Sequence, residues 1–148
     1  MTTSHPRGRS AAAHLTHPPA VDSAGPEAVA LAATGGLVLD PWQASVLDVA
    51  LGERADGRWA AREVGLVVPR QNGKGSILEA LILASLLLFD EKLILYSAHE
   101  FKTAQETFLR VKALIEANDD LRSRISKVYN AHGSEGIELT TGHRLRFI

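Results

Sequence analysis

The segment that most constrains the fold of this chain runs from residue 63 to residue 89. An apolar run at 64–68 is followed by Pro69 and by small polar residues that end in Gly73-Lys74. The apolar stretch at 75–89 then predicts a long helix. A strand, a Gly-Lys loop and a helix in this order are typical of a loop that holds phosphate. Its backbone N–H groups and its lysine contact the phosphate oxygens, and the helix directs its positive end at the same anion.

The loop departs from the full pattern G-x-x-x-x-G-K-[ST] at two positions. Val68 stands at the leading glycine position, and Gly75 stands directly after Lys74, where a hydroxyl normally contacts Mg²⁺. Ser76 lies one place further on, which turns its side chain by about 100° around the helix. Ser76 could still bind the metal if the loop has an extra residue; otherwise water replaces the protein ligand. An ordinary strand–turn–helix connection is the alternative, because Asn72-Gly73 is also a turn signal.

Size and composition limit the possible functions. The 148 residues suffice for one domain with a core, and a net charge of −1 gives no general electrostatic attraction to nucleic acid. The absence of cysteine excludes a disulfide scaffold or a cysteine-zinc site and fits a reducing compartment. The most apolar segment, 77–89, is too short to cross a bilayer and contains Glu79, so no membrane contact is expected.

The order of the predicted elements indicates an α/β fold. Residues 1–35 are rich in Ala, Pro, Thr, Ser and His and predict a disordered leader, in which His5, His14 and His17 are solvated. Residues 36–148 are expected to form the ordered domain. Its predicted elements are a helix from Asp40-Pro41, buried strands at 64–68 and 92–97, helices at 75–89, 101–117 and 120–126, and a hairpin of 136–140 with 144–148. This order predicts a three-layer sandwich around a parallel sheet with right-handed crossovers.

Three segments of the chain, in this order, resemble motifs of the ATPase domain of phage large terminase subunits, the motors that package DNA into the heads of tailed phages. They are Asp40-Pro41-Trp42-Gln43, the loop Pro69-Arg70-Gln71-Asn72-Gly73-Lys74-Gly75, and the run from Leu93 through Ser97-Ala98 to Thr103-Ala104-Gln105 and Phe108. The resemblance covers residues 37–148. It implies a P-loop NTPase of the RecA-like type that binds ATP with Mg²⁺ through residues 69–76.

The resemblance also implies roles for single residues. Lys74 would neutralise the β- and γ-phosphates, Arg70 would contact the γ-phosphate and stabilise charge during transfer, and Gln43 would hydrogen-bond the adenine edge. The alternatives are a solvated lysine, a surface turn arginine and an exposed helix glutamine, with Trp42 a packing residue. Residues 102–105 could contact DNA or couple to it, or could be a solvated helix face. Solvated positions are expected for Arg122, Arg124 and Lys127, and Arg144 and Arg146 are expected on the outer face of the hairpin.

The partners implied by the resemblance are double-stranded DNA, the portal, the small terminase subunit and other large subunits in a ring. The implied location is the host bacterial cytoplasm, transiently at the procapsid portal. Hydrolysis in this fold needs an apolar strand that ends in Asp-Glu. The only Asp-Glu pair, Asp90-Glu91, precedes a strand and predicts a turn.

We therefore expect an incomplete ATPase domain, without the catalytic carboxylates and the nuclease domain, that binds ATP and hydrolyses it poorly on its own. A piece of a packaging motor, from a prophage remnant or a split gene, is the leading interpretation. A non-hydrolysing nucleotide-binding module or another P-loop ATPase, such as a helicase, is the alternative. Gly75 argues against a kinase, because kinases usually keep Gly-Lys-Ser/Thr.

Overall fold

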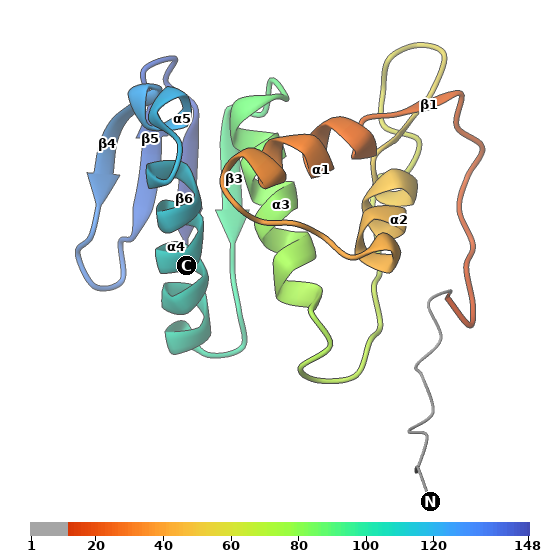
Figure 1. Cartoon of the computed structure of the whole chain (residues 1–148), viewed down its shortest axis with the longest axis horizontal. Coiled ribbons are helices and arrows are strands. Elements are labelled where there is room, and N and C mark those ends of the chain that lie inside the picture. The colour runs from red at the N-terminus through yellow and green to blue at the C-terminus, as the bar shows by residue number, and fades with distance from the viewer. Residues whose placement is uncertain (1–11) are drawn as a thin grey trace, which may run out of the picture.

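The computed structural model describes residues 12–148, so His5 and its neighbours lie outside the described part. The described chain is a mixed α/β structure (Figure 1). Its helices are α1 (Gly25–Thr34), α2 (Pro41–Ala50), α3 (Lys74–Leu87), α4 (Phe101–Glu116) and α5 (Asp119–Ser123). Its strands are β1 (Asp22–Ser23), β2 (Gly52–Glu53), β3 (Leu93–Tyr96), β4 (Ile125–Tyr129), β5 (Gly136–Leu139) and β6 (Arg144–Phe147).

Four strands form the main sheet, in the order β3-β6-β5-β4. Strands β3 and β6 are parallel, with Ile94 opposite Leu145, whereas β5 is antiparallel to both of its neighbours. The hairpin of β5 and β6 agrees with the prediction, and its turn places Gly142 at a φ of 86°, a conformation that glycine adopts without strain. The two short strands β1 and β2 form a separate antiparallel pair.

One apolar cluster lies between α3, α4 and the main sheet. Helix α4 contributes Phe108, Val111 and Ile115, which recur at helical spacing, and the sheet contributes the inward residues of β5 and β6. On β6 the inward Leu145 and Phe147 alternate with the outward Arg144 and Arg146, as the sequence pattern predicts. The second face of this sheet carries no helix among residues 12–148, and Leu93 and Leu95 of β3 are exposed there.

A second apolar cluster joins α1, α2 and α3. Its buried side chains are small or aliphatic: Ala28, Ala32, Leu47, Ile77 and Ala80 are among them. The predicted leader is therefore wrong over 25–34, because α1 is an ordered helix packed in this cluster. The packing is close, since a Cβ at Gly25 would lie 2.5 Å from the Cα of Asp48. Alanine and glycine permit this approach, which large apolar side chains would prevent.

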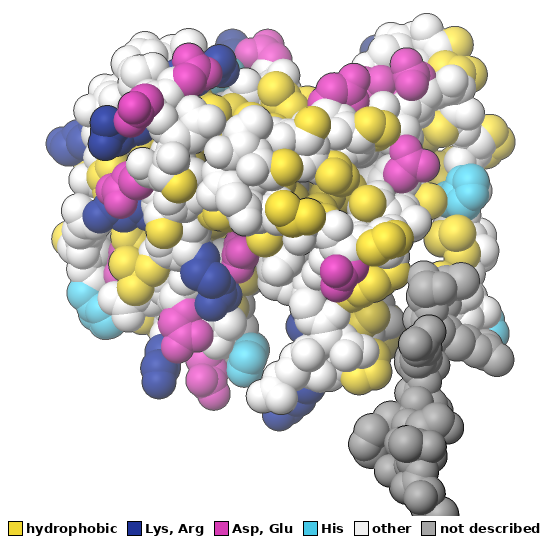
Figure 2. Space-filling view, in the orientation of Figure 1, with side chains coloured by type: hydrophobic (Ala, Val, Ile, Leu, Met, Phe, Trp, Pro, Cys, Tyr) yellow, Lys and Arg dark blue, Asp and Glu magenta, His cyan; other side chains and the backbone are white. Residues whose placement is uncertain are grey.

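The predicted first strand at 64–68 is also wrong. This segment has no regular structure, and Val67 is 99% exposed. A strand exists only through hydrogen bonds to a neighbouring strand, and no strand among residues 12–148 lies beside this one. Between the segment and β3 lies an open apolar cavity of about 380 Å³, lined by Leu66, Ile77, Leu81 and Leu93 among others. Figure 2 shows hydrophobic side chains gathered over the part of the surface around α1–α3.

The predicted short helix at 120–126 ends early. Asn118 caps α5 by accepting hydrogen bonds from the backbone N–H groups of Asp120 and Leu121, and the helix ends at Ser123. Residues 125–129 then form β4, which the sequence did not predict. Its register against β5 shifts between Ile125 and Lys127, which hides the alternation that marks a strand. No helix among the described residues is long and apolar enough to cross a membrane.

Candidate nucleotide-binding loop

The candidate phosphate loop runs from Pro69 to Gly73 and leads directly into α3, whose first residue is Lys74. Two of its residues have left-handed backbone conformations: Gln71 has a φ of 58° and Gly73 a φ of 84°. Left-handed residues between right-handed ones turn successive backbone N–H groups toward a common concave side, which suits an anion. The loop lies at the same end of the molecule as the turn that follows β3 (Figure 1).

Both predicted cations of the loop are exposed. Arg70 and Lys74 form no ion pair with any residue of the described part of the chain. Their charges are therefore not neutralised by neighbouring carboxylates. Together with the N-terminus of a 14-residue helix, they give this end of the molecule a positive character that favours a phosphate group.

Gln43 joins the first two predicted motifs. Its Oε1 accepts a hydrogen bond of 2.7 Å from the backbone N–H of Asp40, and its Nε2 donates one of 2.8 Å to the carbonyl oxygen of Gly73. The residue is only 5% exposed, so the alternative of an exposed helix glutamine is wrong. Trp42 also lies at the loop, because a Cβ at Gly73 would be 3.7 Å from its Cζ2 atom. The adenine contact of Gln43 stays a prediction.

One acidic side chain, Glu79, lies close to the start of α3 and is almost buried, with 7% of its side chain exposed. It pairs with Arg110 of α4, whose Nε lies 2.5 Å from Glu79 Oε1. Arg110 also contacts the Thr107 hydroxyl at 3.4 Å, and that hydroxyl lies 3.2 Å from the hydroxyl of Tyr96 at the end of β3. These hydrogen bonds connect the helix of the loop with α4 and β3.

The sequence reasoning missed this network. The only signal of it in the sequence is Glu79, a carboxylate in an otherwise apolar helix. Ser76, the candidate metal ligand, is half-buried and is the third residue of α3. Within residues 12–148, no group of three or more His, Asp or Glu side chains could hold a metal ion by itself.

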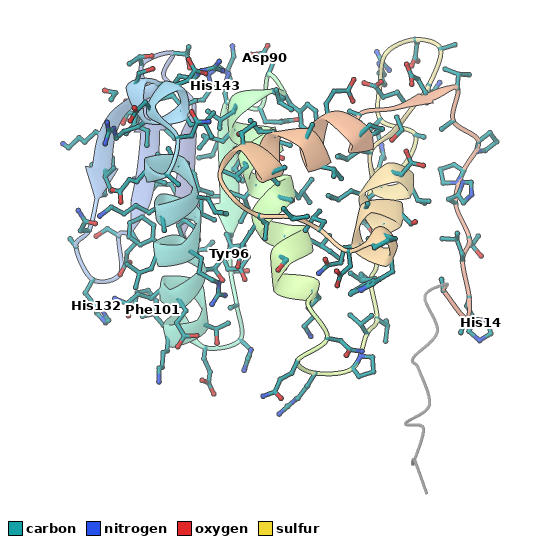
Figure 3. All side chains as sticks on the ribbon, in the orientation of Figure 1. His14, Asp90, Tyr96, Phe101, His132 and His143 are labelled. Carbon is teal, nitrogen blue, oxygen red and sulfur yellow. The ribbon has the colours of Figure 1, made fainter. Side chains whose placement is uncertain are left out.

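The third predicted motif begins at Leu93, the first residue of β3, and continues on α4. Gln105 contacts the buried Glu135 at 3.4 Å, and Thr103 accepts a hydrogen bond from Thr107 through its carbonyl oxygen, so part of this motif faces the protein interior. Figure 3 shows Phe101 beside His132, with ring centroids 4.6 Å apart. Asp90, in the connection between α3 and β3, contacts His143 at 3.2 Å at the opposite end.

Comparison with known proteins identifies the fold. No protein-family model and no curated protein matches the sequence. Among solved structures, the large terminase of bacteriophage HK97 superposes on 84% of this chain with a TM-score of 0.65 at 15% sequence identity. The match spans 26% of that protein, so the matched part of this chain corresponds to about a quarter of its length. The chain therefore has the fold of part of a phage large terminase.

Proposed function

We propose that this chain is the nucleotide-binding part of a large terminase of a tailed phage or prophage, and that it binds ATP with Mg²⁺ through residues 69–76. The observation that carries the proposal is the loop itself. Two left-handed residues deliver Lys74 to the start of α3, in a fold shared with the HK97 large terminase. A surface turn would explain the exposed cations, but it would not explain why a buried side chain, Gln43, is hydrogen-bonded to the loop.

Each residue of the loop has a distinct role in this proposal. The Lys74 ammonium neutralises the β- and γ-phosphates, and Arg70 contacts the γ-phosphate, where charge develops during transfer. Gln43 has two N–H groups on its amide nitrogen, and only one is needed for Gly73. The second N–H is the group that would contact adenine, beside the Trp42 ring.

We further propose that the domain is a three-layer P-loop sandwich. One edge of β3 is unpaired among residues 12–148, and the apolar cavity separates it from residues 64–68. A further strand added at this edge of β3 would cover Leu95. Hydrolysis requires a carboxylate on such a strand. We expect the chain by itself to bind ATP with little turnover.

The partners and location follow from the terminase proposal alone. A packaging motor acts on double-stranded DNA, in a ring with other large subunits, with the small subunit and the portal as further partners. Such a motor works in the host bacterial cytoplasm at the procapsid. Residues 102–105 are the segment through which the nucleotide site would be coupled to DNA.

Titration with a fluorescent ATP analogue tests the proposal. The wild-type chain should bind it saturably in the presence of Mg²⁺. Lys74→Ala should weaken binding by about 10- to 100-fold, the equivalent of one charge-assisted contact to phosphate. Lys127→Ala is the matched control, because Lys127 is an exposed lysine on β4, at the far edge of the sheet from β3, and it should bind like the wild type. A phosphate-release assay on the same samples measures turnover, and no saturable binding by the wild type would refute the proposal.

A further inference from the structure

The position after Lys74, where other phosphate loops carry a hydroxyl, is open in this chain. Gly75 has no side chain, and a Cβ placed there would meet one side-chain atom within 4 Å, the Oε1 of Glu79 at 3.9 Å. The space that a Ser or Thr side chain would occupy therefore faces a carboxylate. The buried carboxylate of Glu79 therefore lies beside the position where the hydroxyl is missing.

Glu79 is held in this position by its surroundings. It lies one helical turn after Gly75, and long side chains of a helix lean toward the N-terminus, here toward the phosphate loop. Arg110 donates a hydrogen bond to Oε1. Oε1 is therefore both the oxygen nearest the open position at Gly75 and the one that Arg110 contacts, and it keeps a second acceptor site for a water molecule.

Stability alone does not account for this arrangement. Burying a carboxylate is costly, and an ion pair with a half-exposed arginine returns only part of that cost. Apolar residues of similar size would fit α3, whose other inward positions are Ile77, Ala80 and Leu83. A carboxylate in the first two turns of this particular helix therefore calls for a functional explanation.

We propose that Glu79 takes the place of the missing hydroxyl and binds, through a water molecule, the divalent cation that accompanies the nucleotide. The proposal rests on the ATP site proposed above. Mg²⁺ keeps several of its waters and is commonly held by one or two carboxylates together with substrate phosphates, so a single acidic side chain is sufficient. Arg110 is a positioning residue, because it fixes the carboxylate without contacting the nucleotide.

The magnesium dependence of ATP binding tests this proposal. The affinity for a fluorescent ATP analogue is measured in excess Mg²⁺ and in EDTA, and the ratio of the two is the magnesium enhancement. In the wild type we expect an enhancement of about tenfold, similar to one charge-assisted contact. In E79Q the enhancement should be lost, so that the affinity in Mg²⁺ falls to the value in EDTA. E106Q, which removes an exposed acid from α4, is the matched control and should keep the enhancement.

A rescue variant separates a metal ligand from a structural residue. In G75S/E79Q the hydroxyl stands directly after Lys74, and the enhancement should return, which a merely structural role of Glu79 would not explain. Binding of Mn²⁺ in the presence of ATP, measured by electron paramagnetic resonance, gives a second readout. Should E79Q fail to fold by circular dichroism, E79Q/R110M serves for the same test, because it leaves no buried charge unpaired.

The outcomes distinguish the two proposals. If the wild type binds no ATP, the proposed function is wrong and this proposal with it. If the wild type binds ATP and E79Q keeps the full enhancement, only the role of Glu79 is overturned. Loss of the enhancement in S76A but not in E79Q would assign the metal to the Ser76 hydroxyl and overturn the proposal in the same way.

Discussion

Gln43 and Gly73 lie 30 residues apart in the sequence and are joined by one hydrogen bond, from the Gln43 Nε2 to the Gly73 carbonyl oxygen at 2.8 Å. The other end of the same amide accepts the N–H of Asp40 at the start of α2. A single buried side chain thus fixes the phosphate loop relative to α2. We therefore expect the shape of the loop to depend on this contact as well as on its own sequence.

Two substitutions of Gln43 separate its two bonds. Gln43→Glu keeps an acceptor for Asp40 but has no donor for Gly73, and it places a carboxylate against a carbonyl oxygen. We expect Gln43→Glu to weaken ATP binding by about tenfold.

Gln43→Ala also loses the helix cap, and it should lower the free energy of unfolding, measured in urea, by about 1–2 kcal/mol. Ser45→Ala, at an exposed position of α2 away from the loop, is the control. Unchanged ATP affinity in Gln43→Glu would show that the contact does not shape the loop.

A second prediction concerns Gly73 itself. Gly73→Ala introduces a Cβ at a φ of 84°, and this atom would lie 2.7 Å from Gln43 Nε2. Gly142→Ala has the same strain at a φ of 86°, but its Cβ meets nothing within 4 Å. Both should lose about 1–2 kcal/mol of stability from the left-handed conformation.

Only Gly73→Ala should also lose nucleotide affinity, because it displaces the Gln43 amide. Urea unfolding and fluorescent ATP titration on the same two variants measure the two effects. Equal ATP affinity in both variants would contradict the importance of the Gln43 contact.

Local patterns were sufficient to predict several elements. The apolar run after Lys74 became α3, the run at 92–97 became β3, and the hairpin formed around Gly142. The strand at 64–68 was wrong because a strand depends on a partner, which a local pattern does not contain. Helix α1 was missed for a different reason: its buried residues are Gly25, Ala28 and Ala32, and such small residues resemble a low-complexity leader because no large apolar side chains mark a face.

The candidate site also has parts that the sequence indicated and parts that it did not. The resemblance assigned Gln43 and the candidate phosphate loop to one nucleotide site, and their binding of nucleotide stays a prediction; the hydrogen bond between Gln43 and Gly73 was not predicted. The pairing of Glu79 with Arg110, 31 residues further on, depends on how α3 and α4 pack, and a linear pattern does not show it. Long-range contacts between side chains were therefore the main part of the site that the sequence did not predict.

A third prediction concerns Glu135, which is 1% exposed. Its Oε1 has a weak contact with Gln105 at 3.4 Å, and its Oε2 is buried without a hydrogen-bond partner among the described residues. An unpaired buried carboxylate is costly. Glu135→Gln has nearly the same shape and no charge, so it should raise the free energy of unfolding by about 1–2 kcal/mol.

Urea unfolding monitored by circular dichroism measures this difference. Glu138→Gln is the matched control, because Glu138 lies on the neighbouring strand β5, is less buried and accepts a hydrogen bond from the Tyr129 hydroxyl. The control should change stability by less than about 0.5 kcal/mol. A loss of stability in Glu135→Gln would mean that the carboxylate is stabilised by a contact that the structure does not contain.

The last prediction concerns the open face of β3. Leu93 and Leu95 are 50% and 59% exposed on this face, next to a strand edge that no strand within residues 12–148 pairs with, and both features favour self-association. Leu95→Lys should therefore reduce the concentration-dependent increase in mass measured by light scattering, with a stability change below about 0.5 kcal/mol. Ile94→Lys, on the opposite face of the same strand, should instead unfold the chain, because Ile94 packs against the buried cluster of α4. A wild-type chain that stays monomeric at all concentrations would show that this edge does not mediate association.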